Sequence, residues 1–187
     1  MSSVYDGLVS RLLNRRLSRP IARLLTHTPV TPNQVSFASL AIAAASFATF
    51  AVGLPILGGL LAQASSIVDG VDGDLARMKQ KTSAFGGFLD AILDRYADAL
   101  IILGLLLWAT RGETSPHVWI AGFCALTGSL VISYTRARIQ EAPPTLFDRG
   151  VTSLASRDVR LLIIMFGGIL GLGYATLLII AVLTHTV

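Results

Sequence analysis

Cysteine is almost missing from this chain of 187 residues, because only Cys124 is present, within an apolar run. This absence excludes a disulfide framework and a thiolate metal site within one chain. Charged residues are also scarce, at 14% of the chain, whereas a soluble domain carries about a quarter. Hydrophobic residues make up 53%. The composition therefore predicts one integral membrane domain, with no room for a second domain.

Internal repeats, low-complexity tracts and basic patches interleaved with aromatic residues are all missing as well. The last absence argues against nucleic acid as a partner. A signal peptide fits poorly, because charge runs through the whole N-terminal stretch. Thirteen of the fifteen lysines and arginines lie in three regions, residues 11–23, 77–81 and 136–160. The positive-inside rule places these regions on the cytoplasmic side, so we expect a multi-pass protein of the cytoplasmic membrane.

The apolar segments that are present predict an all-α integral membrane fold, with six transmembrane helices preceded by an interfacial amphipathic helix. Residues 1–30 form the juxtamembrane part, because apolar residues and five arginines alternate there at helical spacing. Residues 31–187 form the transmembrane domain, whose first helix is expected to start at Thr31 and Pro32. Four segments of this domain are long and apolar enough to span a membrane, at about 33–52, 56–78, 86–108 and 117–140. Two short helices follow after Val159. A group of glycines, at positions 167–173, predicts the turn between the last two.

Four aspartates lie in two neighbouring predicted helices: Asp69, Asp72, Asp90 and Asp94. Acids at membrane depth are unfavourable and mark functional sites. Each pair is three or four residues apart and therefore shares a helix face. We expect the two helices to be antiparallel neighbours, so that all four carboxylates converge on one cytoplasm-facing pocket. Their mutual repulsion would be relieved by hard divalent cations, Mg²⁺ or Mn²⁺, and two such ions could clamp a phosphate.

Other residues nearby need separate interpretations. Gly73 and Gly86 leave space for a substrate at the backbone, and Arg77 can bind phosphate. Salt bridges from Arg77 and Arg95 alone cannot neutralise four acids. A loop lysine or arginine is the expected partner of Asp74. Three interpretations stay open for Asp98: a pair with Arg95, a bond to a neighbouring helix, or metal ligation.

The stretch from Asp69 to Asp94 resembles the signature of the CDP-alcohol phosphotransferase family, D-x2-D-G-x2-A-R-x8-G-x3-D-x3-D, at every position. The resemblance implies transfer of a substituted phosphate from a CDP-alcohol donor to an acceptor hydroxyl, with release of CMP. It implies that Asp69, Asp72 and Asp90 bind two divalent metals and that Asp94 is the general base and also a ligand. It also implies a CDP site with these residues: Asn33, Asp69, Gly73, Ala76 and Arg77.

The run Ser133–Arg138 resembles an element of family members that accept inositol phosphate, and Arg157 and Arg160 follow it on the same side. These arginines form a candidate acceptor-phosphate site: Arg136, Arg138, Arg157 and Arg160. An ordinary positive flank explains them equally well at this point. Lys81–Gly87 and Ser156–Arg160 are most similar to archaeal di-inositol-phosphate phosphate synthases, which use CDP-inositol and inositol phosphate. Phosphatidylinositol-phosphate synthases, which use CDP-diacylglycerol, are the alternative.

The resemblance also implies a homodimer and fusion of this domain to a soluble cytidylyltransferase. Two other classes of protein place acids at membrane depth. A prenyltransferase carries its acid clusters in separate halves of a larger bundle, whereas both pairs here lie within 26 residues. An ion-coupled transporter would be expected to show repeated halves, and none is visible.

Overall fold

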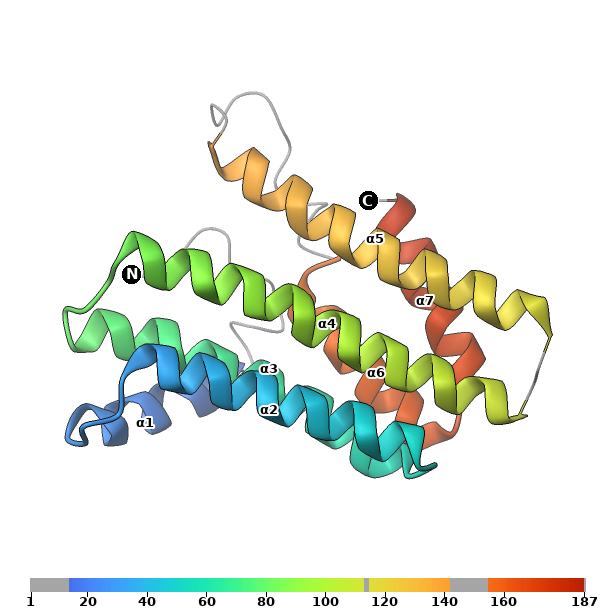
Figure 1. The fold of residues 1–187 in the computed structure, drawn as a ribbon, viewed down its shortest axis with the longest axis horizontal. Helices are drawn as coiled ribbons and strands as arrows, with labels where there is room; N and C mark the ends of the chain where they lie inside the picture. Colours follow the sequence, from blue (N-terminus) through green and yellow to red (C-terminus); the bar gives the residue numbers. More distant parts are fainter. Residues whose placement is uncertain (1–13, 113–114, 142–154, 187) are drawn as a thin grey trace.

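The computed structural model describes residues 14–112, 115–141 and 155–186. Within these ranges the chain is all-helical, as predicted, and no strand is present (Figure 1). The helices are α1 (Arg15–Thr26), α2 (Pro32–Ala51), α3 (Pro55–Met78), α4 (Ala84–Gly112), α5 (Pro116–Glu141), α6 (Arg157–Leu170) and α7 (Gly173–Thr186). The predicted amphipathic helix began before the described residues, so only its later part, α1, can be compared.

Helix boundaries follow local signals that the sequence carries. The Thr31 side chain accepts a hydrogen bond from the Gln34 backbone while the Gln34 side chain caps the Thr31 backbone, and Pro32 occupies the first turn of α2. The predicted glycine turn is also confirmed, because Gly171 ends α6 with a φ of 73°, which favours glycine. One boundary differs: α4 continues to Gly112, beyond the predicted end near residue 108.

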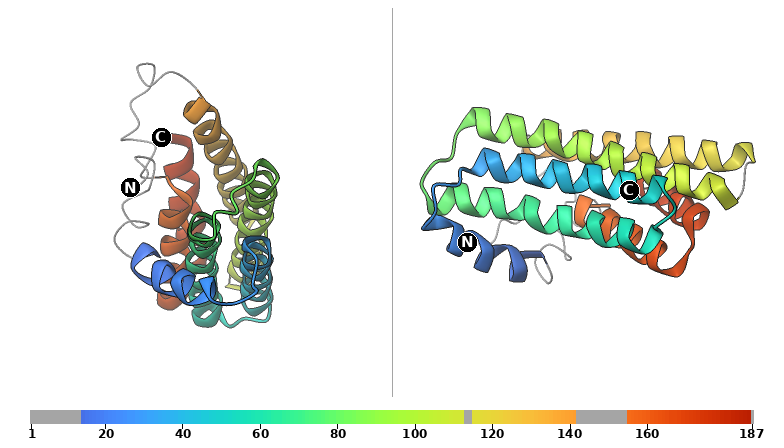
Figure 2. Two further views of the ribbon diagram at one scale, coloured as in Figure 1. Left: turned by 90° about the vertical axis from the view of Figure 1, so that its left-hand side faces the viewer. Right: turned by 60° about the horizontal axis from the view of Figure 1, so that its bottom comes forward.

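The two acid-bearing helices are antiparallel, as predicted, but they contact each other only over a small area. Helix α2 packs extensively against both α3 and α4 (Figures 1 and 2). At α4 the approach is close: a Cβ added to Gly104 would lie 2.7 Å from the Phe47 Cα. Helix α2 also bonds to α3, because the Ser46 hydroxyl of α2 donates to the Gly58 carbonyl of α3 at 2.7 Å. Facing carboxylates repel each other, so a direct helix contact at their level would be unfavourable.

Polar bonds fasten α1 to the side of α3. The Asn14 amide donates to the Ser66 hydroxyl at 2.9 Å and to the Asp158 carboxylate at 2.8 Å, and the Gln63 amide donates to the Asn14 carbonyl oxygen at 2.8 Å. One turn further along α1, the Ser18 hydroxyl donates to Asp74 at 3.2 Å. This network joins α1, α3 and the start of α6 behind the acids.

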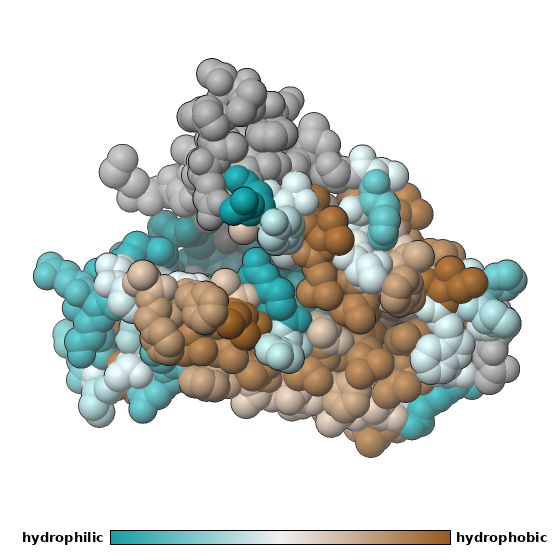
Figure 3. All heavy atoms as spheres, turned by 45° about the horizontal axis from the view of Figure 1, so that its top comes forward, coloured by the Kyte–Doolittle hydropathy of each residue, from teal (hydrophilic) through white to brown (hydrophobic). Residues whose placement is uncertain are grey.

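The surface of the bundle is largely apolar. In Figure 3 apolar residues cover a broad central area, and hydrophilic residues gather most densely at the left end. The same end holds the α1–α2 linker and the α3–α4 loop (Figure 1). Two helical segments in the described ranges, Pro32–Ala51 and Pro116–Arg138, are long and apolar enough to cross a membrane.

Candidate active site

Three of the four predicted aspartates come together between α3 and α4. Asp69, Asp72 and Asp90 each offer a carboxylate oxygen, and these oxygens all lie within 4.8 Å of one another. Asp72 is buried and the other two are half-buried. The fourth acid, Asp94, lies beside Asp69, because a single guanidinium nitrogen contacts both. The predicted convergence of the acids on one location is therefore present in the fold.

The donor set fits a hard divalent cation. It consists of carboxylate oxygens, which Mg²⁺ and Mn²⁺ prefer. In addition, the Oδ1 atom of Asp90 is buried and has no hydrogen-bond partner. A buried carboxylate oxygen without a partner is unfavourable, and a bound cation would satisfy it.

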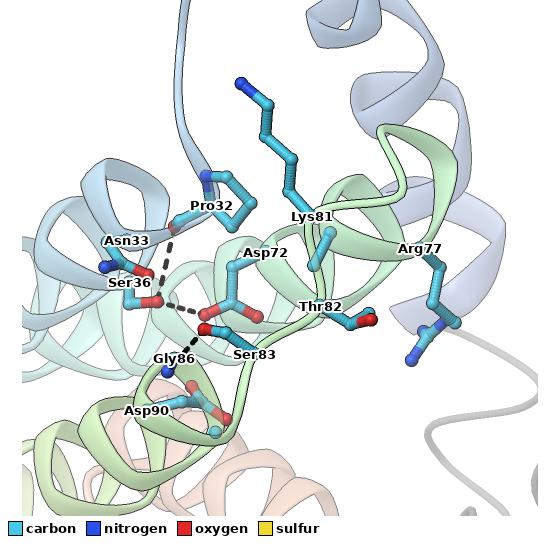
Figure 4. A pocket seen from close by; sticks show the side chains of 13 residues that line it. Pro32, Asn33, Ser36, Asp72, Arg77, Lys81, Thr82, Ser83, Gly86 and Asp90 are labelled. Atoms are coloured by element: carbon cyan, nitrogen blue, oxygen red, sulfur yellow. Dashed lines mark hydrogen bonds between the residues drawn. The ribbon is translucent and has the colours of Figure 1, made fainter.

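A cavity of about 240 Å³ opens next to these acids. Asp72 and Asp90 line it from α3 and α4, and the α3–α4 loop closes one side with Lys81, Thr82 and Ser83 (Figure 4). All of the predicted CDP-binding residues except Asp69 line the same cavity: Asn33, Gly73, Ala76 and Arg77.

Glycines keep this cavity open. A Cβ added to Gly73 would contact only the flexible Arg77 guanidinium, at 3.6 Å. At Gly86 it would lie 3.1 Å from the Ser83 hydroxyl, which accepts a hydrogen bond from the Gly86 backbone at 3.0 Å. Arg77 lies apart from Asp72 and Asp90 in Figure 4 and bonds Asp74 at 2.7 Å. The expected pairing of Asp74 with a basic residue is present, with a helix residue in place of a loop residue.

Ser36 is a site residue that the sequence analysis missed. Its hydroxyl donates to the Oδ2 atom of Asp72 across the α2–α3 interface (Figure 4). The side chain is only 5% exposed, so water cannot easily replace it. The sequence shows a serine one turn after the Thr31–Pro32 start of the helix. A single serine, however, does not reveal which acid on another helix it contacts.

Two arginines at the start of α6 lie beside the acids, and one of them, Arg157, contacts the cluster. Arg157 contacts Asp69 at 2.7 Å, Asp94 at 3.1 Å and Asp98 at 2.9 Å. Arg160 contacts the other oxygen of Asp98 at 2.7 Å. Of the three interpretations of Asp98, a bond to a neighbouring helix is therefore the one that the structure shows. Arg157 and Arg160 are partners that the sequence analysis did not include when it counted bases against acids, but they contact only three of the five acids.

The other two arginines of the candidate acceptor site lie near the end of α5. Arg138 is exposed and Arg136 is half-buried. Ser133, one turn before Arg136, accepts a hydrogen bond from Arg160 at 3.2 Å, so this end of α5 lies beside the start of α6. Arg95, by contrast, sits at the rim, 3.7 Å from Asp94.

Known proteins are similar to this chain in sequence and in fold. The chain is 49% identical over 177 residues to the "Bifunctional IPC transferase and DIPP synthase" of Rubrobacter xylanophilus, covering 95% of this chain and 40% of that protein. The chain thus spans well under half the length of this relative.

Solved structures agree with the sequence match. A crystal structure of Mycobacterium tuberculosis phosphatidylinositol phosphate synthase with CDP-DAG bound is similar, with a TM-score of 0.73 and 27% identity over 91% of this chain and 89% of that one. A structure of the same enzyme with manganese and citrate has a TM-score of 0.69 at 27% identity, over 90% of this chain and 83% of that one. Residues 29–187 match the sequence profile described as CDP-alcohol phosphatidyltransferase. The chain therefore belongs to the CDP-alcohol phosphatidyltransferase family.

Proposed function

We propose that this domain transfers a substituted phosphate from a CDP-alcohol to the hydroxyl of an acceptor and releases CMP. The observation that carries the proposal is the cluster of Asp69, Asp72 and Asp90 beside a cavity lined by the other signature residues. A phosphate-transfer site needs cations that face the phosphate and space for the nucleotide. The acid cluster supports the first requirement, and the adjoining cavity supports the second.

Asp69, Asp72, Asp90 and Asp94 would hold the metal, which we propose to be two Mg²⁺ or Mn²⁺ ions. When bound, such ions polarise phosphate oxygens and neutralise the charge that develops on them. The manganese complex of the mycobacterial synthase supports a divalent metal in this fold. The carboxylate oxygens of this chain also favour a hard divalent metal.

Asp94 is the proposed general base. Its side chain is 18% exposed and lies beside Asp69, so it is partly accessible to an acceptor hydroxyl. The carboxylate would take the hydroxyl proton as the oxygen attacks the phosphorus atom and the bond to CMP breaks. CMP leaves as a phosphate monoester, and the product keeps the phosphate that joins the two alcohols.

The donor would bind in the 240 Å³ cavity. Gly73 and Ala76 present little side-chain bulk there, Asn33 contributes an amide, and Arg77 supplies a guanidinium at the mouth. The side chain of Arg77 is 58% exposed, so it can turn from Asp74 toward a diphosphate.

The acceptor would be a phosphorylated polyol held by Arg136, Arg138, Arg157 and Arg160. We propose CDP-inositol as donor and inositol phosphate as acceptor, giving di-inositol-phosphate phosphate. The name of the Rubrobacter relative supports this substrate pair. The alternative, CDP-diacylglycerol with inositol phosphate, is supported by the CDP-DAG complex of the mycobacterial synthase.

We further propose that α2 to α7 are six membrane-spanning helices, that α1 lies in the interface, and that the site faces the cytoplasm. Leu17, Ile21 and Leu24 of α1 are exposed at helical spacing, as an interfacial face requires. The helices α6 and α7 have 14 residues each, about 21 Å, and are short for a bilayer core of about 30 Å. A homodimer and a fused cytidylyltransferase are part of the same proposal.

The test is an assay of the purified chain in detergent. CDP-inositol or CDP-diacylglycerol is supplied with inositol phosphate and Mg²⁺ or Mn²⁺, CMP is measured, and the product is identified. We expect Asp94→Asn to abolish turnover but leave Mn²⁺ binding largely intact, because the other three carboxylates remain, and Asp69→Asn to weaken both turnover and Mn²⁺ binding. Asp74→Asn, outside the cluster, is the matched control and should retain Mn²⁺ binding. No CMP from either donor would refute the proposal.

A further inference from the structure

One side chain, Arg157, makes contacts that the proposed chemistry does not yet use. Its Nη1 atom lies 2.7 Å from an oxygen of Asp69 and 3.1 Å from an oxygen of Asp94. Its Nε donates to Asp98 at 2.9 Å. The side chain is only 14% exposed, and its remaining nitrogen, Nη2, is buried without a hydrogen-bond partner. The guanidinium therefore sits among three acids, of which two are proposed to take part in metal binding.

Anchoring of α6 does not explain this placement. Arg160, one turn later, already fixes the helix through Asp98 at 2.7 Å, the Ala155 carbonyl at 2.6 Å and the Ser133 hydroxyl at 3.2 Å. Its side chain is 3% exposed, so these contacts are shielded from water. Arg157 adds a second cation, and it is directed at Asp69 and Asp94, which Arg160 does not touch.

A divalent ion held by the Asp69 carboxylate would lie close to the Arg157 guanidinium, which contacts the same carboxylate at 2.7 Å. Two cations at that distance repel each other strongly in a partly buried site. The carboxylates need one cation or the other, because a group of close, buried acids without a counter-charge is unfavourable. The long side chain of Arg157 starts at the first residue of α6, so it can turn aside without any movement of the helix.

We propose that Arg157 is a resident counter-ion that exchanges with a divalent cation for Asp69 and Asp94, and that only the displaced guanidinium binds the phosphate of the acceptor. This inference rests on the proposed function, since it requires the cluster to bind metal. Its consequence is an order of binding: the metal must enter before the acceptor phosphate finds its arginine. The unpartnered Nη2 supplies a donor for that phosphate once the guanidinium has turned.

The test measures Mn²⁺ binding, which does not depend on turnover. The full chain is purified in detergent without metal, and Mn²⁺ is titrated while the free ion is followed by electron paramagnetic resonance. We expect Arg157→Gln to bind Mn²⁺ about 5- to 150-fold more tightly than the wild type, the usual range for coupling between two ligands. Arg95→Gln is the matched control, because Arg95 also faces a cluster acid, but from the rim at 3.7 Å. Its Mn²⁺ affinity should stay within about twofold of the wild type, well below that coupling range.

A second titration follows inorganic phosphate. The wild type should bind phosphate only when Mn²⁺ is present, and Arg157→Gln should lose this binding. Should Arg157→Gln fail to fold, Arg157→Lys serves, since its single ammonium cannot reach three acids and should also raise Mn²⁺ affinity. Wild-type or weaker Mn²⁺ affinity in the folded variant refutes the exchange and leaves the proposed function standing. Absence of Mn²⁺ binding by the wild type refutes both the exchange and the proposed metal site, and CMP release in the enzyme assay tests the transfer reaction separately.

Discussion

Replacement of Ser36 by alanine should weaken metal binding although Ser36 is not itself a proposed ligand. The hydroxyl donates to one oxygen of Asp72, and Ser36 is 5% exposed, so water cannot easily take its place. A hydrogen bond to a charged group contributes about 1.5–3 kcal/mol. Since about 1.4 kcal/mol is a factor of ten, the expected loss of Mn²⁺ affinity is roughly 10- to 100-fold, the range seen for residues that orient metal ligands.

The matched control lies one turn along the same helix. Ser39 is buried and bonds the Ser65 hydroxyl and backbone of α3, but no acid of the cluster. Ser39→Ala should lower thermal stability about as much as Ser36→Ala while leaving Mn²⁺ affinity unchanged. Ser36→Thr keeps the hydroxyl and should restore most of the affinity. A folded Ser36→Ala protein whose Mn²⁺ affinity changes less than about twofold would contradict the orientation argument.

Three further changes probe other parts of the site. Asp98→Asn leaves the buried Arg160 guanidinium without a carboxylate and removes one of the three acids around Arg157, so we expect it to lose about 3–5 kcal/mol of stability, measured by thermal unfolding in detergent. Gly73→Ala fits without a backbone clash and should raise KM for the donor at unchanged stability, whereas Gly168→Ala, which meets the Pro55 carbonyl, should lower stability. Arg138→Ala should raise KM for the phosphorylated acceptor more than for the CDP donor, and equal effects would speak against an acceptor site there.

Local signals in the sequence account for most of the helices. Thr31, Pro32 and Gln34 determine where α2 starts, and the glycine at position 171 determines where α6 ends, because each acts through its own backbone neighbours. The extension of α4 was missed because Arg111 looked like a loop residue. In the structure its guanidinium bonds the Ala51 carbonyl at the end of α2, a contact that no local pattern reveals.

The meeting of the acids was predictable from spacing, since helical periodicity places Asp69 with Asp72 and Asp90 with Asp94. Their counter-charges were not predictable in the same way. Arg157 is about 60 residues from Asp94, and its approach depends on how α6 packs against α3, which periodicity cannot supply. The same limit explains Ser36, whose partner lies on another helix.

Because α2 packs against both α3 and α4, its side chains affect the geometry of the acid cluster. Because α3 and α4 touch α2 far more than each other, the distance between the two pairs of acids depends on side-chain size along a helix that carries no acid. Ser39 and Ala43 are fully enclosed there. A bulkier residue at either position would spread the carboxylates, so metal preference can be tuned by substitutions that never touch the ion.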